Sequence, residues 1–223
     1  PALQSRLPYD PQKDLNPVSL IGKQPIVLAV HRSLPASSVK DLVALAKARA
    51  GAINYGSGGV GTIFHIGTEL LQSLGGVSML HVPYKGSGVA VTALIGNEIQ
   101  VMLGGISTLL PHVARGSIRA LAVTGAPRSK FAPELPTIAE SGFPGFDVSS
   151  WYALLVPAGT SPAIVNRISG AAIKAVELPD VQEAMSRQGL DVETSTPQAL
   201  TARIKSETAV WAGVIREAGI KAD

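Results

Sequence analysis

Short apolar segments alternate with segments of helical periodicity through the middle of the chain. The first is PIVLAV at residues 25–30, a continuous apolar run rich in β-branched residues that is typical of a strand buried on both faces. Residues 38–51 follow with apolar side chains at helical spacing and a closing glycine, as at the end of a helix. Elements that alternate in this way form βαβ units, so the sequence predicts an α/β fold with a parallel sheet covered by helices on both sides.

The same patterns place the remaining elements. In the middle of the chain they predict strands at residues 52–56, 77–85, 99–105 and 117–125, and helices at 62–76, 86–97 and 106–116, the last interrupted near Pro111. Toward the carboxyl terminus they predict a buried strand at 151–160, helices at 161–176, 179–189 and 197–219, and a short strand at 191–195.

Two proline-rich segments suggest how these elements are divided. Residues 1–25 are predicted to be extended with little regular structure, and residues 126–150 to form a long connection that crosses from one body to another. We therefore expect two domains. Residues 1–25 and 150–223 would be parts of domain 1, and residues 26–149 would form domain 2 with crossover strands at its ends.

The composition excludes several classes of protein. Hydrophobic residues make up 46% of the chain and charged residues 16%, which favours a folded core over a disordered chain. No apolar run approaches the roughly 18 residues of a membrane span. The net charge of +3 is scattered and aromatic residues make up only 4%, so nucleic-acid binding is not indicated. There is no cysteine, and no pair among His31, His65, His81 and His112 has the spacing of a helical metal site, so we expect no metal and no cofactor.

Glycine-rich loops follow three of the predicted strands in the middle body. They are GSGGVGT at residues 56–62, KGSG at 85–88, and Gly104 with Gly105. Ligands of parallel sheets bind outside the carboxyl ends of the strands, and uncovered amides at a helix amino terminus favour anions. Thr62 or Ser57 is expected to cap the helix that follows the first loop. The sequence therefore favours a small anionic ligand, although glycines that serve only tight turns remain an alternative.

The first loop also contains G-x-G-x-x-G, formed by Gly56, Gly58 and Gly61, which raises the alternative of a nucleotide-dependent enzyme. A dinucleotide site needs an acidic residue about 20 positions further on to bind the ribose, and the chain has none there. The sequence also lacks the nucleophile elbow, the P-loop and the helical zinc motif. We therefore expect that the protein is not an enzyme.

Several single residues allow more than one interpretation. His65 precedes Glu69 by four positions and could form a surface pair with it or contact the ligand. Lys85 could be an anion clamp or a solvated loop charge. Trp151 and Tyr152 open a predicted strand and are expected to serve core or hinge packing more than ligand binding.

Five ordered blocks resemble a known family. They are LPYDPQKDLNPVSLIG, NYGSGGVGTIFHIGTELL, HVPYKGSGVAVTALIGNEIQVML, LPHVARGSIRALAVTG and WYALLVPAGTSPAIVNRI. In this order they are similar to the periplasmic solute-binding proteins of tripartite tricarboxylate transporters, the Bug or TctC-like family. The resemblance implies a type II periplasmic-binding-protein fold, with two βα domains joined by crossover strands. It also implies a carboxylate held between the domains and delivered to membrane permease subunits.

The resemblance assigns candidate ligand-binding residues. In the first loop and the helix after it they are Ser57, Gly58, Gly61, Thr62 and His65, and in the second loop Tyr84, Lys85 and Gly86. Gly104 and Gly105 stand where many members of the family carry an acidic residue, so an amino acid is less favoured than a plain mono- or dicarboxylate.

The resemblance also leaves some questions open. Family members begin with a strand and a glycine-rich loop that this chain lacks, so we expect the first domain to be incomplete. We expect the full-length protein to be a periplasmic monomer. A sensory binding protein that does not take part in transport remains an alternative.

Overall fold

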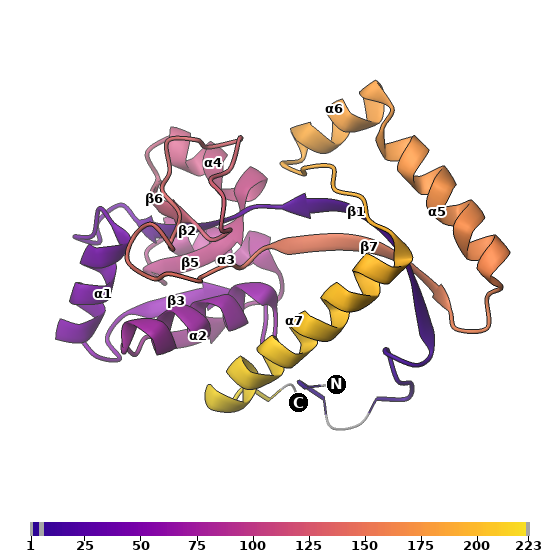
Figure 1. Ribbon diagram of the computed structural model, residues 1–223. Helices are drawn as coiled ribbons and strands as arrows, with labels where there is room; N and C mark the ends of the chain where they lie inside the picture. The colour runs from indigo at the N-terminus through magenta and orange to yellow at the C-terminus, as the bar shows by residue number, and fades with distance from the viewer. Residues whose placement is uncertain (1, 5–6, 222–223) are drawn as a thin grey trace. The chain divides into compact units, whose positions relative to one another are not determined.

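The computed structural model describes residues 2–4 and 7–221, and it divides the chain into two compact units. Unit 1 consists of Pro1–Gln24 with Ser150–Asp223, and unit 2 is the continuous segment Pro25–Ser149. Figure 1 shows unit 2 from its first strand, the indigo β2 (Ile26–His31), to the salmon segment that precedes β7 (Ser150–Pro157). Each unit is described by itself below.

Unit 2 is built on a five-stranded sheet in the order β4-β3-β5-β2-β6. Its strands are β2 (Ile26–His31), β3 (Asn54–Ser57), β4 (Leu80–Pro83), β5 (Val101–Gly105) and β6 (Ile118–Val123). β3 runs parallel to both β4 and β5, as expected. β2 is antiparallel to both of its neighbours, so the prediction of an all-parallel sheet is wrong. The apolar run at β2 indicated burial on both faces, which a central strand has in either direction.

Four helices of unit 2 follow these strands: α1 (Val39–Ala48), α2 (Ile63–Gly75), α3 (Ser87–Ile95) and α4 (Ile106–Ala114). α2 ends at Gly76, which has the left-handed conformation (φ 58°) that favours glycine at a helix end. α4 continues through Pro111, so the predicted interruption is wrong. The ring removes one helical hydrogen bond, while Ile106 and Leu109 hold the helix on the core with almost no exposure.

One buried cluster in the core of unit 2 lies between its sheet and the helices α3 and α4. It joins β2, β5 and β6 through a continuous set of buried side chains: Val27, Ala29, Leu94, Ile99, Met102, Ile106, Leu109 and Val123. Residues 126–149 also belong to this unit. Val148 is fully buried and its backbone exchanges hydrogen bonds with Thr124, so this part of the predicted connection lies along unit 2.

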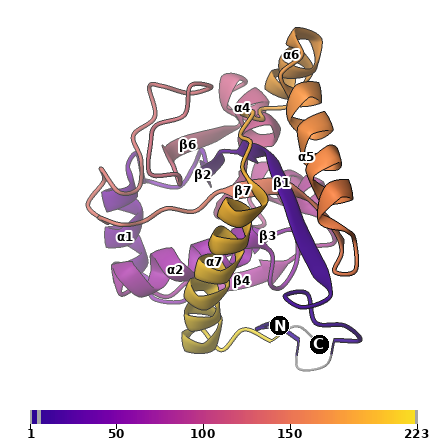
Figure 2. The ribbon, with the colours of Figure 1, turned by 45° about the vertical axis from the view of Figure 1, so that its right-hand side comes forward.

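Unit 1 contains the antiparallel pair β1 (Leu15–Gln24) and β7 (Ser150–Pro157), with α5 (Pro162–Val176), α6 (Pro179–Arg187) and α7 (Pro197–Glu217). Both α5 and α7 contact β1 (Figure 2). The prediction of little regular structure is wrong for β1, where Pro17 lies at a register shift that a strand can tolerate.

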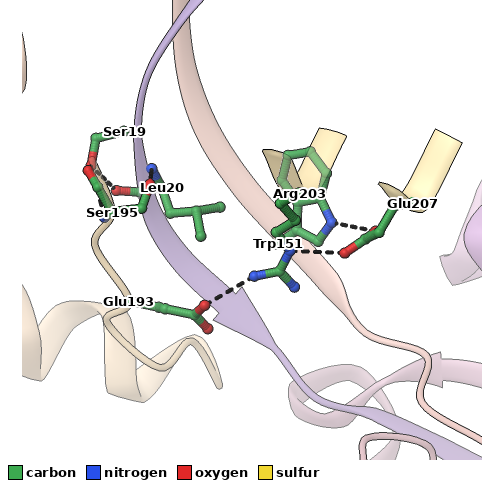
Figure 3. A network of polar contacts seen from close by, with 7 residues as sticks. All are labelled: Ser19, Leu20, Trp151, Glu193, Ser195, Arg203 and Glu207. Carbon is green, nitrogen blue, oxygen red and sulfur yellow. Dashed lines mark hydrogen bonds and ion pairs between the residues drawn. The ribbon is translucent and has the colours of Figure 1, made fainter. Parts of the chain in front are cut away.

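Two further predictions for unit 1 are wrong. β7 is a strand, but it is only partly buried, and Tyr152 is 45% exposed, so it is not the buried strand that was expected. Residues 191–195 do not form a strand; only a single bridge joins Asp191 to Lys23. Hydrogen bonds between Ser19 and Ser195 hold this segment instead of a strand ladder (Figure 3).

A polar network fixes α7 to β7 within unit 1 (Figure 3). The indole N–H of Trp151 donates to Glu207 Oε2 at 2.8 Å, and Arg203 donates to the other oxygen of the same carboxylate at 2.8 Å. Arg203 also pairs with Glu193 at 2.9 Å. Trp151 therefore has a packing role inside unit 1, in keeping with the structural interpretation of this residue.

Candidate functional site

Two glycine-rich loops and the glycine pair that ends β5 lie at one edge of the unit 2 sheet. The strands that precede them, β4, β3 and β5, are parallel neighbours, and Ser57 lies opposite Pro83 in the register. Each strand leads directly into the amino terminus of a helix, namely α3, α2 and α4. The three glycine segments therefore share one edge of the sheet, and each meets a helix amino terminus.

The first loop, residues 57–62, presents free backbone donors. Within the part of the chain that the structure describes, four N–H groups in and beside this loop have no hydrogen-bond acceptor: those of Gly58, Val60, Ile63 and Phe64. The last two belong to the first turn of α2, where a helix has no internal partner for them. Together with the positive end of the helix dipole they favour a negative charge at this position.

Other polar groups of the loop are already engaged. Thr62 is the N-cap of α2: its Oγ1 accepts the N–H of His65 at 3.4 Å and donates to the Gly59 carbonyl at 2.9 Å. Ser57 does not cap the helix. Its hydroxyl is fully buried, where it contacts His81 Nε2 at 2.7 Å and accepts the N–H of Gly59 at 3.2 Å.

His65 lies in a buried aromatic stack and not on the helix surface. The ring is 6% exposed and lies against His81, with centroids 3.7 Å apart and planes inclined by 13°. Its Nδ1 accepts the N–H of Gly61 at 3.1 Å. The interpretation of His65 as a surface partner of Glu69 is wrong, because the Glu69 carboxylate accepts hydrogen bonds from Tyr55 and Gln72.

Burial sets the protonation of this stack. It lowers the pKa of His65, and together with the nearby His65 it lowers the pKa of His81 to about 4. Both rings are therefore neutral at pH 7, and the proton of His65 lies on Nε2 because Nδ1 is an acceptor. Burial and then the hydrogen bond to Glu69 raise the pKa of Tyr55, whose ring stacks on His81 at 4.8 Å.

The second loop is joined to the first through the backbone. Tyr84 N–H donates to the Ser57 carbonyl at 3.0 Å, and Gly86 N–H donates to the Gly58 carbonyl at 3.1 Å. Gly86 has φ 105°, a conformation that other residues rarely adopt. Lys85 is exposed between them. The structure therefore brings together the predicted residues of both loops.

The third glycine segment is explained by packing and is not a loop, because Gly104 and Gly105 belong to β5 and α4 begins at Ile106. Gly104 is buried in β5 opposite Val27, and a Cβ at this position would lie 2.8 Å from Leu109 Cδ1. Gly105 is the N-cap residue of α4, whose first N–H, on Ile106, donates to the Pro25 carbonyl. The close approach of α4 to the sheet thus requires a small residue at position 104.

Sequence reasoning gave no role to His81. It considered histidine pairs only by their spacing along the chain, and residues 65 and 81 are far apart in sequence. The signal lay in the register of two strands, because Tyr55 of β3 is directly opposite His81 of β4.

Comparison with known proteins identifies the family. Residues 1–220 match the family described as "Tripartite tricarboxylate transporter family receptor". The chain belongs to this family. Its resemblance to Bug and TctC-like proteins is thereby confirmed, and the family consists of receptors and not of enzymes. No helix in residues 2–4 and 7–221 is long and apolar enough to cross a membrane.

Curated relatives in the receptor family cover nearly all of the chain. Protein BugT of Bordetella pertussis is 36% identical over 99% of this chain and 68% of its own length. The UPF0065 protein in the tcbD-tcbE intergenic region of Pseudomonas sp. is 34% identical over 98% of this chain and 65% of its own length. The chain thus spans about two thirds of the length of these relatives.

Solved structures show the same fold. Rpa4515 of R. palustris with adipate matches 98% of this chain and 73% of its own, with a TM-score of 0.88 and 32% identity. The match to MatC of Rhodopseudomonas palustris with bound malate covers 96% of this chain and 74% of the MatC chain, with a TM-score of 0.84 and 28% identity. The match to the periplasmic binding protein BugD covers 100% of this chain and 75% of the BugD chain, with a TM-score of 0.86 and 28% identity. These matches confirm the two-domain α/β fold of periplasmic solute-binding proteins.

Proposed function

We propose that this receptor-family chain captures a small mono- or dicarboxylate in the periplasm and delivers it to the membrane permease subunits of a tripartite tricarboxylate transporter. The observation that carries the proposal is the set of free amides in and beside the 57–62 loop. The similar proteins solved with adipate and with malate support a carboxylate ligand.

The carboxylate is received by backbone donors in this proposal. One carboxylate group accepts the N–H groups of Gly58 and Val60 together with those of the first turn of α2. Hydrogen bonds to a charged group contribute about 1.5–3 kcal/mol each, and the helix dipole adds about 0.3–1 kcal/mol. Backbone donors recognise the head group without regard to chain length, so the loops do not select one carboxylate.

The other predicted site residues support this arrangement. Ser57, Gly61 and Thr62 give it its shape through hydrogen bonds to His81, His65 and Gly59, respectively. Tyr84 and Gly86 hold the second loop beside the first, and the exposed Lys85 adds a positive charge near the site. Gly104 and Gly105 close the edge without adding a negative charge that would repel the ligand.

A substitution that removes one free amide tests the proposal. Val60 is 43% exposed, so Val60→Pro removes its N–H while disturbing little packing, and Val60→Ala is the matched control that keeps it. We expect Val60→Pro to weaken binding of adipate or malate about tenfold in isothermal titration calorimetry, and Val60→Ala to change it little. Equal affinities in two folded variants would contradict the placement of the ligand.

Delivery is tested separately in cells. Uptake of radiolabelled adipate or malate should require both the chain and the permease genes. Binding without any effect on uptake would favour a sensory receptor over a transport receptor.

A further inference from the structure

The 57–62 loop is held at both ends by two histidines that lie behind it. At its beginning, the buried hydroxyl of Ser57 contacts His81 Nε2 at 2.7 Å. Near its end, the N–H of Gly61 donates to His65 Nδ1 at 3.1 Å. The two rings stack at 3.7 Å, so a single unit ties both ends of the loop to β4 and α2.

The loop needs such support because its own sequence leaves it flexible. Gly59 has φ 138° and Gly61 has φ 77°, and glycine in these conformations has many alternatives of similar energy. Fixing one residue in a single backbone conformation costs about 1–2 kcal/mol. An anion site made of amides works only if the amides already point toward one place.

We propose that His65 and His81 are positioning residues that hold the loop in its carboxylate-receiving shape, and that His65 does so only while its ring is neutral. This inference rests on the proposed function, which it extends by assigning the residues that preorganise the site and make it sensitive to acid.

The chemistry of His65 explains why charge matters. A proton on Nδ1 of His65 removes the acceptor of the Gly61 N–H. The N–H of the ring and the N–H of Gly61 then point at each other, and neither has an acceptor there. A charge on either ring also lies 3.7 Å from the neighbouring imidazole, in a site where burial already disfavours charge. Gly61 is then released, and the amides beside it lose their common direction.

The charged and titratable groups around the stack do not offset this effect. From β3 the stack faces Tyr55, which stays neutral because burial raises its pKa. From α2 the nearest carboxylate is Glu69, which is engaged by the hydroxyl of Tyr55 and by Gln72. The 57–62 loop carries no charged side chain, and Lys85 beyond β4 is exposed.

The test compares variants that keep or remove the acceptor of Gly61. His65→Asn places an amide oxygen near the position of Nδ1 but does not titrate, whereas His65→Leu removes the acceptor. His81→Gln and His81→Leu form the same comparison at Ser57, and His112→Asn on α4 is a control away from the stack. Adipate and malate serve as probes in calorimetry between pH 7.5 and 5.0.

Between pH 7.5 and pH 5.0, the affinity of the wild type for adipate should fall by a factor about ten times larger than the affinity of His65→Asn. Only the wild type loses the acceptor of the Gly61 N–H in acid. The titration of the ligand itself is common to all variants. The leucine variants should bind about tenfold more weakly than wild type already at pH 7.5, and the amide variants should recover most of that loss. Equal pH profiles in wild type and His65→Asn would overturn the inference.

Two measurements separate this inference from the proposed function. Ring ¹⁵N spectra should show His65 as the Nε2–H tautomer at pH 7.5, and the Nδ1–H tautomer would overturn the inference whether or not a ligand binds. Hydrogen exchange of the Gly61 amide should be slow in wild type and His65→Asn and fast in His65→Leu; equal rates in all three would also overturn it. Absence of carboxylate binding by wild type at every pH would instead overturn the proposed function.

Discussion

Gly56 in β3 lies so close to Ile99 that a Cβ at position 56 would overlap the Cδ1 of that side chain. Ile99 is completely buried in the core of unit 2. The first glycine of the G-x-G-x-x-G pattern therefore serves packing within the sheet and not the approach of a nucleotide.

This contact predicts a specific rescue. Gly56→Ala should destabilise unit 2 by about 1–3 kcal/mol through overpacking, and Ile99→Val alone by about 0.5–1.5 kcal/mol through lost volume. Because Ile99→Val removes the overlapping methyl group, the double variant should be clearly more stable than the sum of the two losses implies. Urea denaturation with hydrogen exchange of unit 2 peptides measures this coupling, and strictly additive losses would contradict the packing role.

The periodicity of apolar residues predicted some features of the fold and not others. Periodicity predicted the existence and order of nearly all strands and helices, because it reports which side chains are buried. It did not predict the direction of β2, because a strand buried on both faces has the same apolar run in either direction. It also missed β1, whose hydrogen bonds go to β7 from the other end of the chain.

A second prediction compares two glycines near the site. A Cβ at Gly58 would lie 2.9 Å from Oγ and 3.0 Å from N of Ser87, whereas a Cβ at Gly88 would meet nothing within 4 Å. Gly58→Ala should therefore cost about 1–3 kcal/mol of unfolding free energy by pushing the two loops apart. Gly88→Ala should gain up to about 1 kcal/mol, since alanine favours the helical conformation. Equal thermal stability of the two variants would show that the loops separate without cost.

A third prediction concerns the stability of unit 2 in acid. The pKa of His81 is about 4 in the folded chain against an ordinary value of 6.5, so the unfolded chain binds the proton more tightly. The contribution of the neutral ring is complete above pH 6.5 and is lost as the pH falls from 6.5 to about 4. A shift of this size corresponds to about 3 kcal/mol, which the partial exposure of the ring reduces to about 2 kcal/mol.

A variant that cannot titrate is the control for the loss of stability between pH 6.5 and about 4. His81→Gln cannot titrate, so its unfolding free energy should change less than that of wild type between pH 7 and pH 5. Carboxylates with a lowered pKa, such as Asp41 and Glu140, lose their contribution only at lower pH. Urea titrations at pH 7, 6 and 5, read by hydrogen exchange of unit 2, measure the difference. Parallel curves for the two proteins would rule out this role for the histidine.

A fourth prediction concerns the network of unit 1. Glu207 accepts hydrogen bonds from Trp151 and Arg203, so Glu207→Ala leaves the partly buried indole N–H of Trp151 without this acceptor and leaves Arg203 paired with Glu193 alone. We expect a loss of about 1–2 kcal/mol and a red shift of tryptophan fluorescence. Glu183→Ala breaks an exposed pair with Arg187 and should cost at most about 0.5 kcal/mol. Similar losses in both variants would mean that the network contributes no more than a surface ion pair.

The candidate site was predictable to a similar extent as the fold. Three glycine-rich loops after parallel strands could be read from the chain, because short patterns of glycine mark both turns and helix starts. Which donors remain free could not be read, since the partner of the Gly61 amide is a side chain of α2 and that of the Ser57 hydroxyl comes from β4. Such pairings depend on strand register and helix orientation, which sequence spacing does not encode.

The central position of β2 has a consequence for synthesis. This strand leaves the ribosome first among the strands of unit 2, yet its two neighbours, β5 and β6, end at residues 105 and 123. Until they emerge, six residues that are all buried in the folded chain have unpaired edges on both sides. Contacts between distant segments form slowly and expose such strands to aggregation. β2 therefore stays unpaired while residues 32–100 are being translated, a period in which β3, α2 and β4 can assemble locally but neither neighbour of β2 has formed.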